Sequence, residues 1–184
     1  MKYQIYFLNH WVVVLFMLAI FSTASIAQNN NEKEIFADAK ATKAAFIAEN
    51  DKTAKFFNSA YGYAIYPSIG KGAVGIGGAH GNGILFKGGA VQAPTSMSQV
   101  TVGFQWGGQA YMEVVFFEDQ RAYDNFVSGK LKLSGQASAV AVTAGASFDV
   151  KYNDGVAIFT MVKGGLMYEA SVGGQKFDVK EWKN

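Results

Sequence analysis

The chain has 184 residues, including 21 glycines and no cysteine, and it carries a formal net charge of +2 at pH 7. A charge so close to neutral argues against a nucleic-acid-binding protein, which needs a basic surface. The lack of cysteine excludes disulfides, so packing alone must hold the fold together.

Residues 1–27 have the three parts of a secretory signal peptide. Lys2 supplies the positive charge, Trp11 to Phe21 form an apolar run, and Ser25-Ile26-Ala27 is a small-x-small cleavage site. An uncleaved membrane anchor is the alternative, but the apolar run is well short of the roughly 20 residues that span a bilayer. We therefore expect cleavage near Ala27 and a periplasmic or secreted protein.

After the signal peptide, we expect a disordered leader over 28–31 and one domain over 32–184. The domain begins with a helix from Glu32 to about Ala60, which Asn50-Asp51 can break into two. Its apolar side chains fall within one sector of about 120° on a helical wheel. They are Ile35, Phe36, Ala39, Phe46, Ile47, Ala54 and Phe57.

Charged side chains lie on both flanks of this apolar stripe. Lys33 and Lys40 follow one flank, while Lys43 falls inside the apolar sector and must extend its ammonium outward. Acids follow the other flank, at Glu34, Asp38 and Glu49. Two interpretations are open, a surface helix packed on the domain or an amphipathic helix that meets a lipid surface. The acidic flank favours the first.

From Tyr61 onward the apolar period changes to two, with glycine pairs between or inside the runs. This pattern predicts a curved or closed antiparallel sheet. Gln92–Met97 is predicted to be a surface connection, and Asp154-Gly155 a hairpin turn. The expected strands are 61–66, 73–77, 82–87, 98–106, 109–117, 136–150, 156–162, 165–172 and 175–179.

One short helix interrupts the strands, over Glu118–Val127. Asp119 can cap its start and Gly129 can end it. The predicted fold class is therefore α+β: a curved, possibly barrel-like antiparallel sheet with a long N-terminal helix and one short helix.

The stretch Ala60–Phe86 holds eight glycines. Gly70 to Gly75 fit the pattern G-x-G-x-x-G, but more glycine follows instead of a helix, and no acid appears before Glu113. Both features are needed for dinucleotide binding. We therefore interpret the glycines as tight corners of a bent sheet rather than as a phosphate cradle.

Few residues in the chain could carry out catalysis. His80 is the one histidine after the signal peptide, and its glycine-rich surroundings favour an exposed turn. Glu113 and Glu169 lie within apolar strands, where they could act as an acid/base pair, or could each point to solvent or be satisfied by a backbone amide or a lysine. The second interpretation is favoured. We expect a protein that is not an enzyme and that holds no metal or cofactor.

Several strings of residues, taken in order, resemble the SYLF domain, a lipid-binding family with eukaryotic and bacterial members. The resemblance covers about residues 33–180. The strings are Ala60–Pro67, Ile69–Gly72, Gly75–Gly81, Gly107–Tyr111, Phe116–Asp119, Ala137–Ala141, Lys163–Ala170 and Gly173–Phe177.

The resemblance implies an exported lipid-binding module that recognises anionic or phosphoinositide-type phospholipids, in part through its N-terminal helix. The implied head-group contacts are Lys33, Lys40, Lys43 and, in the glycine-rich stretch, Lys71. The implied inserted side chains are Ile35, Phe36 and Phe46. The alternative is a structural or protein-interaction module of the cell envelope.

Overall fold

The chain divides into two units, Met1–Glu34 and Ile35–Asn184, and the sheet belongs to the second. The predicted signal peptide and the leader up to residue 30 lie outside the described residues, whereas Asn31 is already helical. Within the part of the chain that is described, no helix is long and apolar enough to cross a membrane. The computed structural model describes residues 31–74, 76–102, 109–131, 133, 138–143, 150–162, 170–171 and 174–181.

Two helices precede the sheet, one over residues 31–49 and α2 over Lys52–Ser59. The predicted break between them is confirmed. The side-chain carbonyl of Asn50 accepts a hydrogen bond from the Lys52 amide at 3.2 Å, and the Thr53 hydroxyl donates to the Asn50 carbonyl at 2.7 Å. These local bonds satisfy backbone groups that an uninterrupted helix would have paired.

The sheet is built from eight strands in the order β7-β5-β6-β4-β1-β2-β3-β8. A short helix, α3 (Gln120–Val127), follows β4. The strands are β1 (Gly62–Val74), β2 (Ile76–Lys87), β3 (Ala90–Val102), β4 (Gln109–Phe117), β5 (Ser138–Ala141), β6 (Val156–Val162), β7 (Ala170–Ser171) and β8 (Gln175–Val179).

The predicted α+β class is confirmed, with two corrections. Strands β5 and β6 pair in parallel, whereas a wholly antiparallel sheet was expected. Residues 142–155 connect them and are long enough for the crossover that a parallel pair requires. Within the described residues the sheet is also not closed into a barrel, because its two end strands, β7 and β8, are not paired with each other.

Strands β1 and β2 form one long hairpin through the glycine-rich stretch, from the pair Gly62–Lys87 to the pair Val74–Ile76. The corner expected between 61–66 and 73–77 is therefore wrong. Within the described residues, positive φ angles first occur at Gly88 and Gly89, in the turn after β2. None of the earlier described glycines has a positive φ angle, and the chain reverses direction once in this stretch, between Val74 and Ile76.

The surface connection expected over Gln92–Met97 is also wrong, because these residues lie within β3. Pro94 misled the prediction, since proline lacks the N–H that an interior strand uses. Pairing with β8 begins at Thr95, opposite Val179, so Pro94 lies at the end of this ladder, where its carbonyl accepts a hydrogen bond from the Lys180 amide at 2.9 Å.

Other local signals were interpreted correctly. Strands β4, β6 and β8 have the predicted bounds, and α3 begins with Asp119 accepting a hydrogen bond from the Ala122 amide at 2.8 Å. The Asp154-Gly155 turn is present, with φ angles of 50° and 78°. Asn153 and Val156 pair across this turn.

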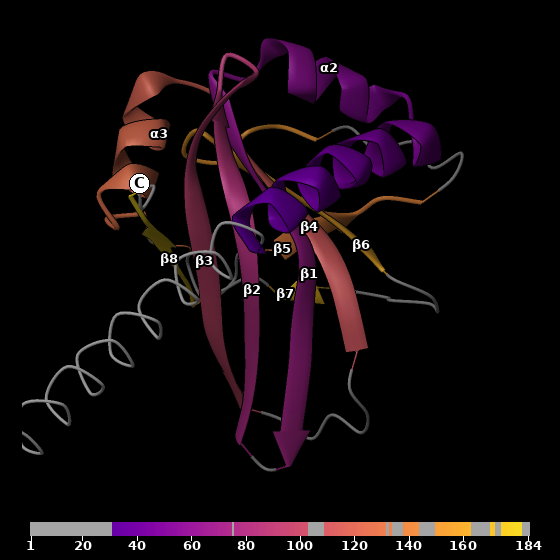
Figure 1. Ribbon diagram of the computed structural model, residues 1–184, viewed down its shortest axis with the longest axis vertical. Coiled ribbons are helices and arrows are strands. Elements are labelled where there is room, and N and C mark those ends of the chain that lie inside the picture. Colours follow the sequence, from indigo (N-terminus) through magenta and orange to yellow (C-terminus); the bar gives the residue numbers. More distant parts are fainter. Residues whose placement is uncertain are drawn as a thin grey trace, which may run out of the picture. The chain divides into compact units, whose positions relative to one another are not determined.

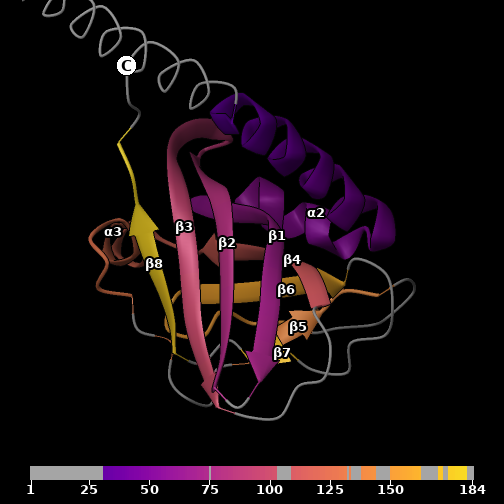
Figure 2. The same cartoon turned by 60° about the horizontal axis from the view of Figure 1, so that its bottom comes forward.

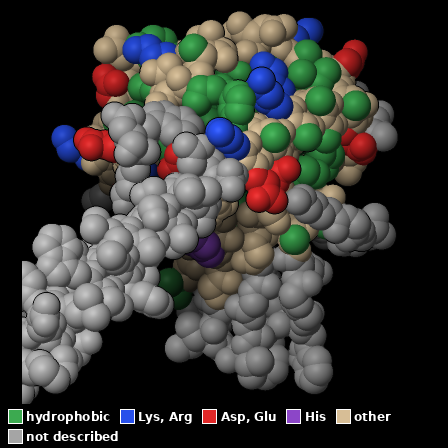
Figure 3. Space-filling view, in the orientation of Figure 1, with side chains coloured by type: hydrophobic (Ala, Val, Ile, Leu, Met, Phe, Trp, Pro, Cys, Tyr) green, Lys and Arg blue, Asp and Glu red, His purple; other side chains and the backbone are tan. Residues whose placement is uncertain are grey.

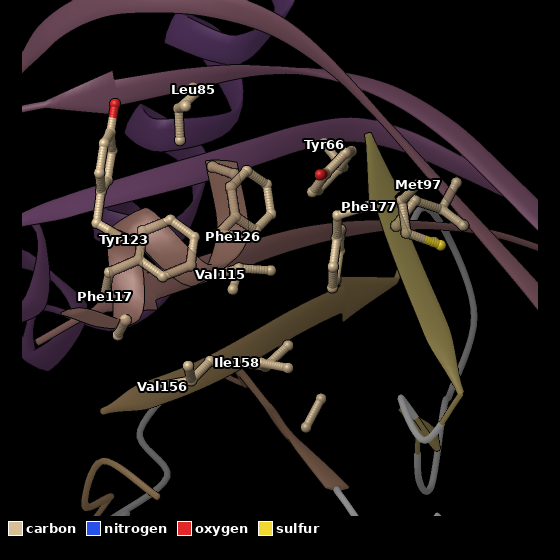
Figure 4. Packing of buried hydrophobic residues seen from close by; sticks show 14 of the residues in the cluster. Tyr66, Leu85, Met97, Val115, Phe117, Tyr123, Phe126, Val156, Ile158 and Phe177 are labelled. Carbon is tan, nitrogen blue, oxygen red and sulfur yellow. The ribbon is translucent and has the colours of Figure 1, made fainter. Parts of the chain in front are cut away.

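Buried side chains cover both faces of the sheet. On one face lie the helix at 31–49 and α2 (Figure 1). They pack against aromatic strand residues, with the Phe57 ring 5.1 Å from that of Tyr63 and 4.8 Å from that of Phe116. On the other face, α3 contributes Tyr123 and Phe126 to a second cluster (Figure 4).

In this second cluster, strand β8 approaches strands from which it is remote in the sheet order. The Phe177 ring on β8 lies 6.0 Å from Tyr66 on β1, although β2 and β3 lie between these two strands. In Figure 2, β6 runs at a steep angle to β1, β2 and β3. The inner side chains of distant strands therefore meet across the interior.

Candidate functional site

The helix at 31–49 is held on the sheet by its apolar stripe. Ala39 and Phe46 are fully buried, and Thr42 is buried with its hydroxyl 3.9 Å from the sulfur of Met112 on β4. Phe46, which the resemblance implied as an inserted residue, is therefore a core residue. It could reach a lipid only if the helix left the sheet.

Lys43 fixes this helix through its side chain. Its Nζ donates a hydrogen bond to the Tyr63 hydroxyl at 3.1 Å, and it lies 4.9 Å from the ring centroid of Phe57. The half-buried stem thus crosses the apolar sector to an aromatic acceptor, rather than ending in open solvent. Lys43 is engaged within the domain, whereas the resemblance implied a head-group contact.

Lys40 and Phe36 form an exposed corner of the same helix. The Lys40 ammonium lies 4.4 Å above the Phe36 ring, and the lysine is exposed while the phenylalanine is half-buried. Ile35 is also half-buried and packs with Phe36 against the core. A cation beside a partly exposed aromatic ring is the chemistry that suits the boundary between lipid head groups and acyl chains.

The other two predicted lysines are Lys33 and Lys71. Lys33 is exposed and belongs to the unit Met1–Glu34. The backbone of Lys71 lies in β1, paired with Ala79 and Gln109, and its side chain lies outside what is described.

Sequence reasoning overlooked two exposed lysines, Lys52 and Lys55 on α2. They point away from Thr53 and Phe57, the buried residues of that helix. The signal was present in the sequence: once Asn50-Asp51 divide the long helix, the second segment has its own inner and outer faces. Figure 3 shows Lys and Arg side chains among hydrophobic ones on the face of the molecule that carries the two helices.

The interior holds a separate cluster of polar side chains, centred on Glu113. This carboxylate is fully buried and accepts a hydrogen bond from Nε2 of Gln175 at 3.0 Å. Thr160, directly opposite Glu113 on β6, is also fully buried. None of the partners expected for Glu113, which were solvent, a backbone amide or a lysine, is this one: the bond comes from the side chain of a glutamine. Glu169 lies outside the described residues.

Two tyrosines beside Glu113 have perturbed acidity. Burial raises the pKa of Tyr66 well above its ordinary value, the hydrogen bond with Thr95 offsets part of the rise, and Glu113 adds to it. Burial also raises the pKa of Tyr111, and Glu113 again contributes. A neutral phenol thus suits this interior far better than a phenolate.

Other candidate chemistry is sparse in the described part of the chain. His80 is exposed, but it lies within strand β2 rather than in the expected turn. Among the described residues, no group of three His, Asp or Glu side chains is placed to hold a metal ion. The cation–aromatic corner on the helices is therefore the stronger candidate for a binding surface.

Comparison with known proteins agrees with the resemblance noted in the sequence. Residues 98–184 match a family model described as "Ysc84: Las17-binding protein actin regulator". The chain is also 31% identical over 127 residues to "Beta cell expansion factor A" from Aeromonas veronii, an alignment that covers 66% of this chain and 46% of that protein. The chain thus spans about half the length of the curated relative that it matches. It belongs to the Ysc84 family, the SYLF domain family.

Proposed function

We propose that this chain is an exported, non-catalytic module that binds peripherally to anionic phospholipid surfaces. The observation that carries the proposal is the corner made by Lys40 and Phe36, where an exposed ammonium lies 4.4 Å above a half-buried ring. The family's association with lipid binding supports the same interpretation. The signal-like residues 1–27 support action outside the cytoplasm.

Binding by this corner is expected to be weak and sensitive to salt. Each lysine near an anionic surface contributes about 1 kcal/mol, and that contribution is screened within a Debye length. Acids on the same helix, including the exposed Asp38, oppose it. The attachment is therefore reversible and depends on anionic lipid rather than on deep insertion.

Vesicle co-sedimentation tests the proposal. The purified protein should pellet with phosphatidylcholine vesicles that contain phosphatidylglycerol, should pellet less as salt is raised, and should stay in solution with phosphatidylcholine alone. Lys40→Glu replaces one attraction by one repulsion, about 2 kcal/mol, and should weaken binding about thirtyfold. Lys130→Glu, at an exposed position after α3, makes the same change of net charge elsewhere and serves as the control.

Two results would contradict the proposal. Wild-type protein that stays in solution with both kinds of vesicle would remove its basis. Equal binding by Lys40→Glu and Lys130→Glu would show that net charge, and not this corner, sets the affinity.

A protein-binding module is the second candidate, and the extent of the family match favours it. The matched residues 98–184 include β4, α3, β6 and β8 but neither N-terminal helix, and the family's description names a protein partner, Las17. If the shared part of the family binds proteins, immobilised chain should capture a partner from an envelope extract at high salt. Capture that survives with Lys40→Glu, while vesicle binding is absent, would favour this candidate.

A further inference from the structure

From residue 33 onward, the acids and lysines of the helix at 31–49 lie on opposite flanks. With 100° per residue, Lys40 lies about 100° to one side of the buried Ala39 and Asp38 about 100° to the other. Phe36 and Ile47 fall on the lysine side, and Glu49 on the aspartate side. The docked helix therefore presents a cationic, partly apolar flank and a separate acidic flank.

Contacts with the rest of the domain show which neighbour each flank has. On the lysine side, Lys43 lies 4.9 Å from the ring of Phe57, so α2 is the neighbour there. On the aspartate side, Thr42 meets Met112, so β4 is the neighbour. The cationic flank thus adjoins α2, while the acidic flank is turned toward the β4 side of the sheet.

Helix α2 continues the cationic surface. Lys52 and Lys55 are exposed, and the helix Lys52–Ser59 contains no acid. Asp51, exposed in the turn before α2, is the neighbouring acid in the sequence. Phe56 is not available for insertion, because its ring packs 4.8 Å from that of Phe159 in the core.

The buried face of these helices shields the sheet from water, and a membrane that took up the helices would not do so. If the helix at 31–49 left the sheet, Phe46 could be buried again in lipid, but the sheet residues beneath it would meet water. Those residues include Ile65, Ile84 and Val114, each fully buried. The hydrogen bond from Lys43 to Tyr63 would also be lost.

We propose that anionic lipid head groups are contacted by α2 together with the cationic flank of the helix at 31–49, while both helices stay docked on the sheet. Lys55 is then a head-group contact equal in importance to Lys40, and Phe46 stays in the core. This inference rests on the proposed lipid-binding function and specifies its surface and its mode.

Two sets of variants test the surface and the mode in the same vesicle assay. Lys55→Glu should weaken binding to phosphatidylglycerol-containing vesicles about thirtyfold, as is expected of Lys40→Glu, while Lys130→Glu should bind nearly as well as wild type. The lack of native cysteine allows a clean cross-link. In a variant with Thr42→Cys and Met112→Cys, a short thiol-reactive linker between the two cysteines should hold the helix on β4. The linked protein should still bind vesicles within about twofold of the same variant without the linker.

The possible failures are distinguishable. Wild-type binding that Lys55→Glu leaves unchanged would overturn the role of α2. Binding that is lost on cross-linking and returns without the linker would show that the helix must undock. In both cases the proposed lipid binding would stand, whereas wild-type protein that ignores every vesicle would remove the proposed function itself. A thermal melt of each variant excludes loss of fold as the cause.

Discussion

Gln175 on β8 donates a hydrogen bond to the Glu113 carboxylate on β4 at 3.0 Å, although β1, β2 and β3 lie between these strands in the sheet. In a flat sheet the two strands would be about 19 Å apart. The bond therefore joins distant strands across the interior, and it does so between two buried groups. We infer that this hydrogen bond helps to hold the edge strand β8 in place.

Removing the hydrogen bond between Gln175 and Glu113 should destabilise the fold. Removing one partner of a buried hydrogen bond costs about 1–3 kcal/mol, so Gln175→Ala should lower the free energy of unfolding by about 2 kcal/mol. Urea unfolding followed by circular dichroism measures the change. Lys176→Ala, the exposed neighbour on the same strand, should stay within about 0.5 kcal/mol of wild type. A similar loss in both variants would contradict a specific role for Gln175.

Lys43 and Tyr63 should show a measurable coupling. The Lys43 ammonium donates to the Tyr63 hydroxyl at 3.1 Å, and a bond of this kind contributes about 1 kcal/mol. Lys43→Met keeps most of the stem, and Tyr63→Phe keeps the ring. A double-mutant cycle of these two changes, measured by urea unfolding, should give a coupling energy of about 0.5–1.5 kcal/mol. Strictly additive losses would mean that the bond does not hold the helix.

The parts of the fold that were predicted correctly depend on local signals. Asp119 caps α3 through the amide three residues later, and the Asp154-Gly155 turn depends on its own φ angles. The errors concern non-local effects. Glycine-rich residues form a long hairpin because neighbouring strands pair with them, and Pro94 is tolerated at the end of the β8 ladder, where its carbonyl still accepts a bond from the Lys180 amide.

In the candidate site, too, local features were predictable from the sequence and non-local ones were not. The helical wheel separates Lys40 from Asp38 correctly, because that depends on helix geometry alone. The wheel could not show that Phe46 is fully buried or that the Lys43 ammonium bonds to the Tyr63 hydroxyl, since both facts depend on the sheet beneath the helix. The bond from Gln175 to Glu113 joins residues 62 positions apart, and no local pattern indicates it.

The buried tyrosines predict how stability depends on pH. Burial raises the pKa of Tyr66 above that of the unfolded chain, about 10, so the unfolded state releases this proton first as pH rises. The stabilisation is thus fully present below pH about 10 and is lost above it, with a slope of about 1.4 kcal/mol per pH unit for each such tyrosine. Tyr111 acts in the same direction.

Urea unfolding between about pH 9 and 11 measures this slope directly. Tyr66→Phe removes the titrating hydroxyl and should reduce the total loss of stability between pH 9 and 11 by about 1.4 kcal/mol, whatever its effect on stability at neutral pH. An exposed tyrosine would leave stability flat across this range, so an unchanged slope in Tyr66→Phe would contradict the burial of its hydroxyl.

Two glycines of the same hairpin should respond in opposite ways to alanine. A Cβ at Gly83 would collide with the carbonyl oxygen of Ile65 and lie 2.7 Å from Cδ1 of Tyr66, so Gly83→Ala should cost about 2–3 kcal/mol. A Cβ at Gly70 would meet nothing within 4 Å, and alanine there restricts the unfolded chain, so Gly70→Ala should stabilise by about 0.5 kcal/mol. Urea unfolding compares the two. Equal losses would mean that the stretch needs glycine for its backbone as a whole, whereas opposite signs would show that packing fixes Gly83 while the fold leaves Gly70 free to change.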